Sequence, residues 1–444
     1  MRRTRSLPAA ATVAVLGAAL AVPASATATA APNRVPPWPT VTSALPTGLL
    51  RPATTTTAAY LARLKSRLDR RVRASALGGD VSVRVEDLAT GQLIYSHRSG
   101  QAQVPASTQK TAVALGVLSA LGPDHVLRTR VVRSGDTITL VGGGDPVLRT
   151  DDVGSLARDA ASALEAGDDS TTDPDPKFRV AYDDSLFAPP SRPAGWYPSY
   201  VGNYSANPTA LTRYGSYSSD SAGDTARLFR KQLKAAGVRT AYGVIRQNAP
   251  QDAELVAEFT DHTVADAIWP MLKFSDNTIA EVMIRHVARA RGTATTTTGA
   301  AAALRSELGR LGIPVGNMRP VDGSGLSRGN RISARTLVAI TRASVNPADP
   351  GLSAGFRYSA FPVSGVSGTL ESRFKSRQTS CAAGRIMAKT GTLSDTLALS
   401  GVTGSTDGRP RAFAIMVNSK PGWASLDSAR FRVDRIAAAI NGCR

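Results

Sequence analysis

The residues that could carry chemistry lie in three short motifs far apart in the chain. The first places Ser107 three positions before Lys110, at the start of an apolar, alanine-rich stretch that ends at Leu121. Residues three positions apart share one face of a helix, so the Lys110 amine can lie beside the Ser107 hydroxyl. A serine is a weak nucleophile that needs a neighbouring base, and a lysine can serve where desolvation and nearby positive charge lower its pKa. The spacing alone is weak evidence, because most such pairs are surface residues.

The second motif is Ser275-Asp276-Asn277, which follows an apolar stretch at 268–272 and precedes a predicted helix over 278–289. A buried hydroxyl and a side-chain amide at this point could relay protons and bind a substrate carbonyl. Taken by itself, the tripeptide is more typical of a helix N-cap.

The third motif is Lys389-Thr390-Gly391-Thr392, which precedes a predicted strand beginning at Leu397. Lys389 would supply a cation and Thr390 a hydroxyl for a carboxylate. Gly391 would let a substrate approach the strand edge closely, because glycine has no side chain in the way. In isolation the motif is more typical of a turn that happens to contain a lysine.

In this order, the three motifs match the S-x-x-K, S-D-N and K-T-G set of penicillin-binding proteins and serine β-lactamases. The chain resembles the low-molecular-mass class C penicillin-binding proteins, the D-alanyl-D-alanine carboxypeptidase/endopeptidases. The resemblance covers roughly residues 75–440. It extends to the segments Pro105–Ser107, Gly142–Pro146, Asp322–Arg328, Phe361–Gly365 and Gly368–Leu370.

The resemblance implies a role for each catalytic position. Ser107 would attack the carbonyl of the penultimate D-alanine and form an acyl-enzyme, which water then hydrolyses. Lys110 would take the serine proton, Ser275 would pass a proton to the leaving D-alanine, and Lys389 would tune that relay. β-Lactams would acylate the same serine and remain attached longer.

The resemblance also implies the groups that bind the substrate. Asn277 would hold the substrate amide, and the Thr390 and Thr392 side chains would hold the terminal carboxylate beside Gly391. The backbone N–H groups of Ser107 and Thr392 would form the oxyanion hole, where each donor is typically worth about 3 kcal/mol in the transition state.

The elements around the motifs predict an α/β (α+β) fold of the penicillin-binding/serine β-lactamase type. It would consist of an antiparallel sheet flanked by helices, together with a helical subdomain. Hydrophobic periodicity predicts an amphipathic helix and two strands near the start of the chain and two strands and a helix near its end, which can form one sheet. These elements are expected at 57–74, 81–85, 93–96, 397–403, 412–418 and 427–440.

The long separation of Lys110 from Ser275 leaves far more chain than a minimal helical subdomain needs. The class C family carries inserted domains at this point, so we predict an inserted, mainly β domain at 128–255. The DD-peptidase domain would then comprise 57–127 and 256–444. A dedicated β-lactamase is disfavoured, because no Glu-x-x-Leu-Asn segment follows Ser275.

The N-terminus predicts export. Three arginines precede a short apolar run, which is followed by Ala24-Ser25-Ala26, and this order is typical of a secretory signal peptide, here assigned to 1–30. The alternative is a membrane anchor, although the run is shorter than the roughly 20 residues that a span needs. The Ala-, Thr- and Pro-rich segment at 31–56 predicts an extended linker, and a disordered leader is equally compatible. We therefore expect a secreted protein of the cell envelope.

Composition narrows the partners. Of 444 residues, 20% are charged and 42% hydrophobic, which excludes a mainly disordered chain. The net charge of +19 favours polyanions, and export makes anionic wall polymers better candidates than nucleic acid. The sequence has four histidines but no H-E-x-x-H pattern, which argues against a zinc peptidase. We expect neither a metal nor a cofactor. We expect Cys381 and Cys443 to form a disulfide, with two buried thiols as the alternative.

The function predicted from these observations is an exported serine-type D-Ala-D-Ala carboxypeptidase or endopeptidase acting on peptidoglycan stem peptides. Two alternatives remain open. One is a catalytically weak relative that binds wall fragments or β-lactams, and the other is a D-amino-acid peptidase or esterase on the same scaffold.

Overall fold

The computed structural model describes residues 58–73, 77–78, 80–166, 177–357, 359–418 and 426–443. The predicted signal peptide at 1–30 and the predicted linker at 31–56 lie outside these residues. Within the described ranges, no helix has both the length and the apolar character needed to cross a membrane.

A five-stranded antiparallel sheet joins the two ends of the described chain, as predicted. Its strand order is β10-β11-β12-β1-β2, and β1 lies against β12 with Val81 opposite Val417. The strands are β1 (Val81–Asp87), β2 (Leu93–His97), β10 (Ile386–Leu393), β11 (Thr396–Thr403) and β12 (Arg411–Val417).

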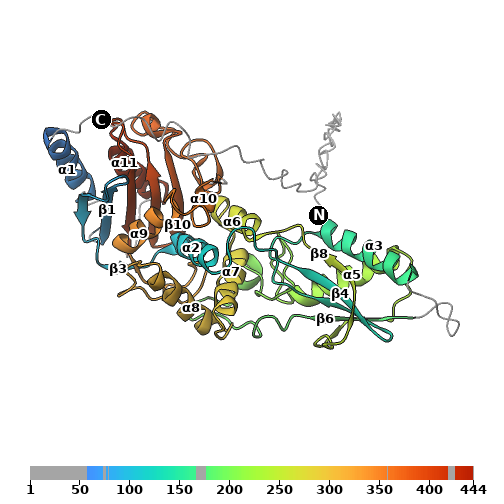
Figure 1. Ribbon diagram of the computed structural model, residues 1–444. Coiled ribbons are helices and arrows are strands. Elements are labelled where there is room, and N and C mark those ends of the chain that lie inside the picture. Colours follow the sequence, from blue (N-terminus) through green and yellow to red (C-terminus); the bar gives the residue numbers. More distant parts are fainter. Residues whose placement is uncertain are drawn as a thin grey trace, which may run out of the picture. The chain divides into compact units, whose positions relative to one another are not determined.

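Helices cover both faces of this sheet (Figure 1). Helices α1 (Ala58–Val72) and α11 (Leu426–Asn441) pack on one face, and α9 (Ala334–Ser344) packs on the other. Strand β12 shows why the chain folds this way, because its successive side chains point to opposite faces. Phe413 and Ile415 join the core formed with α1 and α11, whereas the smaller Ala412 and Ala414 join the core formed with α9.

A helical subdomain packs beside the sheet and carries two of the three motifs. Its central helix is α2 (Gln109–Leu121), which is buried along nearly its whole length because its residues are almost all small or apolar. Gly116 lets α8 come close, since a Cβ there would lie 2.6 Å from Leu304. The surrounding helices are α6 (Val264–Lys273), α7 (Asn277–Ala290) and α8 (Thr297–Arg310).

Short elements connect these parts. They are β3 (Ala102–Gln103), paired with β9 (Ile332–Ser333), the 3₁₀ turns η3 (Ala106–Thr108), η4 (Gly368–Leu370) and η5 (Ser380–Ala382), and α10 (Ala354–Arg357).

The region predicted as an insertion contains the expected sheet. The strand order is β7-β6-β5-β4-β8, antiparallel between β8, β4 and β5 and parallel from β5 to β7. The strands are β4 (Thr129–Ser134), β5 (Thr137–Val141), β6 (Arg179–Asp183), β7 (Ile245–Arg246) and β8 (Glu254–Phe259). Strand β8 continues this sheet past residue 255, where we placed the boundary, and the boundaries themselves remain a prediction.

Two long helices that we did not predict pack on this second sheet, so the region is less purely β than expected. They are α3 (Thr150–Ala166) and α5 (Ser221–Ala235), which share an apolar core with the strands. The buried residues Val153, Leu156, Ala157 and Ala160 follow helical spacing along α3. The short helix α4 (Tyr200–Asn203) lies in the same region.

The structure joins Cys381 and Cys443 in a disulfide, with their Cα atoms 6.1 Å apart. The bond links η5, which precedes β10, to the segment that follows α11.

Candidate active site

Ser107 lies in the tight turn η3, immediately before helix α2. The preceding residue, Ala106, has a φ of +47°, a backbone conformation that residues with a side chain rarely adopt. Strained backbone of this kind is concentrated at functional sites, where the surrounding structure holds it in place. The turn leaves the Ser107 side chain partly exposed while Lys110, one helical turn further on, is completely buried.

The Lys110 amine contacts the serine and two further acceptors. Its Nζ lies 3.1 Å from Ser107 Oγ, 2.8 Å from Asn277 Oδ1 and 2.7 Å from the Ser324 carbonyl oxygen. Burial lowers the pKa of Lys110 to about 8, against the opposing influence of nearby carboxylates such as Asp322. The structure therefore brings the first and second motifs together and favours a lysine that can lose its proton near neutral pH.

The second motif forms the start of helix α7. Asp276 caps the helix by accepting a hydrogen bond from the Ile279 N–H at 2.9 Å, which is the N-cap role considered from the sequence. Asn277 Nδ2 donates to the Tyr204 carbonyl at 2.8 Å, and this bond fixes which side-chain atom of Asn277 faces Lys110.

Ser275 is the second residue near Ser107 with a left-handed backbone, at φ +67°. Its side chain borders the same open spaces as Ser107. Within the described part of the chain, its hydroxyl has no hydrogen-bond partner, so the relay expected between Ser275 and Lys389 is not preformed. The hydroxyl is therefore available to a bound group.

Lys389 is completely buried on strand β10, and its Nζ donates to the Thr390 carbonyl at 2.9 Å. Burial, together with the positive charge of Lys110, lowers the pKa of Lys389 well below 10.5. The surroundings thus disfavour the cation that the sequence led us to expect at this position. The Thr390 hydroxyl lies 2.8 Å from the hydroxyl of Thr369, which belongs to the family-like segment Gly368–Leu370 and had no predicted role.

Strand β10 is the edge of its sheet, so alternate backbone groups face away from β11. On that outer side, the Ala388 N–H donates to the Pro362 carbonyl at 3.0 Å. Because backbone groups alternate with a period of two, the N–H groups of Thr390 and Thr392 face the same side.

Gly391 has a packing role that we did not predict. A Cβ at this position would lie 2.7 Å from the Pro105 carbonyl oxygen and 3.2 Å from the Ala106 Cβ. The glycine therefore lets β10 approach the turn that carries Ser107, whereas we had assigned it to close approach by a substrate.

Two open clefts meet at Ser107, Ser275 and Thr392. One has a volume of about 640 Å³ and extends along Thr390 toward η4 and α11. The other has a volume of about 430 Å³ and is lined by three tyrosines from the region predicted as an insertion, whose rings meet edge to face at 5.3 and 5.5 Å. The tyrosines are Tyr197, Tyr200 and Tyr204. No motif marks them, and only the closeness of the aromatic residues in the sequence could have drawn attention to them.

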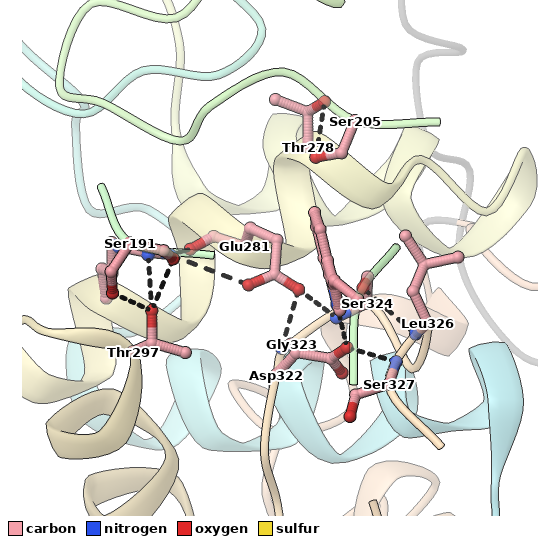
Figure 2. Close-up of polar contacts among 12 residues, drawn as sticks. Ser191, Ser205, Thr278, Glu281, Thr297, Asp322, Gly323, Ser324, Leu326 and Ser327 are labelled. Carbon is pink, nitrogen blue, oxygen red and sulfur yellow. Dashed lines mark hydrogen bonds and ion pairs between the residues drawn. The ribbon is translucent and has the colours of Figure 1, made fainter. Parts of the chain in front are cut away.

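The segment Asp322–Arg328 packs against the nucleophile turn. Asp322 accepts hydrogen bonds from the N–H groups of Gly325 (2.8 Å) and Ser327 (2.6 Å), as Figure 2 shows in part, and from the indole of Trp196 (2.7 Å). A Cβ on Gly325 would lie 1.9 Å from the Ala106 carbonyl oxygen. This segment is therefore a wall of the site, and it is itself held by Trp196 from the region predicted as an insertion.

The described residues contain no group of three or more His, Cys, Asp or Glu residues that could hold a metal ion.

Comparison with protein families identifies the chain. The model of the D-Ala-D-Ala carboxypeptidase 3 (S13) family matches residues 64–214 and 211–440. The chain therefore belongs to this family of serine peptidases, and the resemblance found in the sequence is confirmed.

Curated relatives agree with this membership. A carboxypeptidase of Mycobacterium tuberculosis is 31% identical over 77% of this chain and 76% of its own length. A D-alanyl-D-alanine carboxypeptidase of an Actinomadura species is 29% identical over 83% of each chain.

Solved structures confirm the predicted fold. Penicillin binding protein 4 of Haemophilus influenzae gives a TM-score of 0.69 at 19% identity, covering 83% of this chain and 97% of that one. A β-lactam complex of the same protein gives 0.63 at 20% identity, with the same coverage.

Proposed function

We propose that this serine peptidase removes the terminal D-alanine from peptidoglycan stem peptides through an acyl-enzyme on Ser107. The observation that carries the proposal is the buried Lys110 amine, 3.1 Å from Ser107 Oγ and with a pKa lowered to about 8. A nucleophile within hydrogen-bond reach of a base that is partly neutral near neutral pH is the arrangement that acyl transfer requires.

In the first step, Ser107 Oγ forms a bond to the carbonyl carbon of the penultimate D-alanine, and its proton passes to Lys110. The negative charge that develops on the carbonyl oxygen is held by the backbone N–H groups of Ser107 and Thr392. The outward direction of the Thr392 N–H on edge strand β10 supports this assignment.

The tetrahedral intermediate then breaks its bond to the leaving nitrogen. Ser275 donates a proton to that nitrogen, and its hydroxyl, which borders the same clefts as Ser107, is suited to the task. Burial favours the neutral amine of Lys389, which can exchange a proton with this relay. Water then attacks the acyl-enzyme and returns Ser107 to its free state.

Substrate binding uses both sides of the serine. Asn277 Oδ1 is occupied by Lys110 and one Nδ2 hydrogen by Tyr204, so the second Nδ2 hydrogen can hold the substrate amide carbonyl. The hydroxyls of Thr390 and Thr392 hold the terminal carboxylate.

The same proposal covers the partners and location of the protein. β-Lactams, one of which is bound in a structure of the Haemophilus influenzae relative, would acylate Ser107. Action on peptidoglycan requires export, which the N-terminal sequence predicts, and the net charge of +19 favours contact with anionic wall polymers.

The test combines covalent labelling with product analysis. We expect labelled penicillin to attach to the wild-type protein, and D-alanine to be released from a peptide ending in D-Ala-D-Ala. Ser107→Ala should abolish both, and labelling that survives this substitution would refute the nucleophile assignment. Labelling without D-alanine release would instead favour a binding relative, and turnover of D-amino-acid esters alone would favour an esterase.

A further inference from the structure

We propose that Glu281 is a positioning residue for the base. It fixes the backbone turn whose Ser324 carbonyl holds the Lys110 amine, and it thereby directs the free electron pair of that amine toward Ser107. This inference rests on the proposed roles of Ser107 and Lys110 in acyl transfer.

The Glu281 carboxylate binds the turn directly. Glu281 lies on helix α7 with its side chain 1% exposed, and its Oε1 accepts hydrogen bonds from the N–H groups of Gly323 at 3.0 Å and Ser324 at 2.8 Å. Figure 2 shows the carboxylate pointing from α7 into this turn. The carbonyl of the same Ser324 accepts from Lys110 at 2.7 Å, so Ser324 alone links the Glu281 carboxylate to the base.

Counting hydrogens shows why the direction of this carbonyl matters. A neutral amine has two N–H bonds and one electron pair. Asn277 Oδ1 and the Ser324 carbonyl oxygen are both acceptors without a hydrogen to give, so together they take both N–H bonds of Lys110. The electron pair is then left for the third neighbour, the Ser107 hydroxyl at 3.1 Å. If the Ser324 carbonyl turned away, the amine could point an N–H bond at Ser107 instead of its electron pair. In that orientation the amine cannot take the serine proton.

The surroundings of Glu281 indicate that the carboxylate has more than a packing role. Arg285 Nη1 lies 3.7 Å from its second oxygen, and both side chains are 1% exposed. A buried ion pair of this kind is often no more stabilising than apolar residues of similar volume. Burial raises the pKa of Glu281 to about 7, and in either protonation state its oxygen can accept the two N–H groups. Asp322 holds the N–H groups of Gly325 and Ser327 further along the turn, whereas Glu281 accepts those of Gly323 and Ser324, next to the carbonyl that contacts Lys110.

The experiment compares two double variants of the full chain that differ only in the acceptor. In Glu281→Gln with Arg285→Met, the amide oxygen can still accept from both N–H groups. In Glu281→Met with Arg285→Met, the acceptor is lost but the volume is nearly kept, and no unpaired charge remains in the core. Acylation by a fluorescent penicillin, followed by stopped flow, separates the limiting acylation rate from the dissociation constant of the initial complex.

We expect the Met/Met variant to acylate about 100-fold more slowly than the Gln/Met variant, because misdirection removes most of the benefit of general-base catalysis. The dissociation constants should agree within about twofold, since Glu281 contacts the turn rather than the substrate. Thermal unfolding and circular dichroism show whether each variant is folded. If the Met/Met variant does not fold, the Gln/Met variant, which keeps the acceptor and leaves no unpaired charge, should still agree with wild-type protein in limiting rate within about fivefold.

The inference is overturned if both double variants acylate at the same limiting rate, if the loss appears in the dissociation constant, or if the folded Gln/Met variant falls outside that fivefold range. Absence of acylation in the wild-type protein would refute the proposed function, and the inference with it.

Discussion

The two lysines of the site share complete burial but differ in almost everything else. Lys110 contacts a side-chain hydroxyl, a side-chain amide and a backbone carbonyl from three separate segments, and the carboxylates of Asp322, Asp276 and Glu281 raise its pKa. Lys389 donates to the carbonyl of its own neighbour Thr390 and faces the positive charge of Lys110. Both motifs therefore contain a lysine, but the surroundings of each lysine determine its pKa.

This difference assigns the roles. The nearby carboxylates oppose the effect of burial at Lys110 and hold its pKa at about 8, where both protonation states are accessible near neutral pH. At Lys389 the neighbouring charge acts in the same direction as burial and favours the neutral amine. A group that takes a proton and later gives it back needs the first environment rather than the second.

The strongest way to break the comparison is to replace each lysine in turn by methionine. Lys110→Met should lower the limiting rate of acylation by penicillin about 1000-fold, because it removes the base that contacts Ser107. Lys389→Met should cost about 30-fold, since Lys389 acts through the relay rather than on Ser107. Stopped-flow acylation of folded variants measures both rates, and a larger loss for Lys389→Met would reverse the assignment.

The pH dependence of acylation tests the same comparison with a smaller effect. The reactive form of Lys110 is the neutral amine, and its folded-state pKa of about 8 lies below the ordinary value of 10.5. The neutral fraction, and with it the acylation rate, should therefore fall about tenfold per pH unit below about 8 and level off above it. The rate constant for penicillin labelling between pH 5.5 and 9.5 gives this profile.

Lys389→Met is the control for the profile. The acid limb should stay near pH 8 in this variant, although the absolute rate falls. A limb that disappears in Lys389→Met would show that Lys389, and not Lys110, controls the proton that limits acylation.

The sequence was sufficient for the parts of the site that depend on spacing along one element. Ser107 and Lys110 meet because they are three positions apart on a helix, and the two-residue alternation in the terminal strands predicts the sheet that the structure contains. The helices α3 and α5 could also have been predicted, because each buries apolar residues at helical spacing.

Other parts could not be predicted because they depend on which distant segments meet. Glu281 lies in the middle of a helix, and nothing in its sequence context shows that two N–H groups from residues 323–324 will reach it. The hydroxyl pair of Thr369 and Thr390 and the carbonyl of Tyr204 on Asn277 likewise join separate segments. The proton equilibrium of Lys389 depends on burial, which the motif does not encode.

The disulfide should give the smallest effect on catalysis, because it fixes the approach to β10 without touching either lysine. Cys381 and Cys443 close a loop with a sequence separation of 62, for which chain entropy predicts a stabilisation of about 4 kcal/mol. The double variant Cys381→Ser with Cys443→Ser should therefore unfold at lower urea concentration while its acylation rate stays within about twofold of wild type. Equilibrium unfolding and stopped-flow acylation on the same preparation measure the two quantities. A large loss of acylation rate in folded protein would mean that the disulfide, rather than the sheet, holds β10 and Lys389 in position. The two lysines would then differ in how their positions are fixed as well as in their protonation.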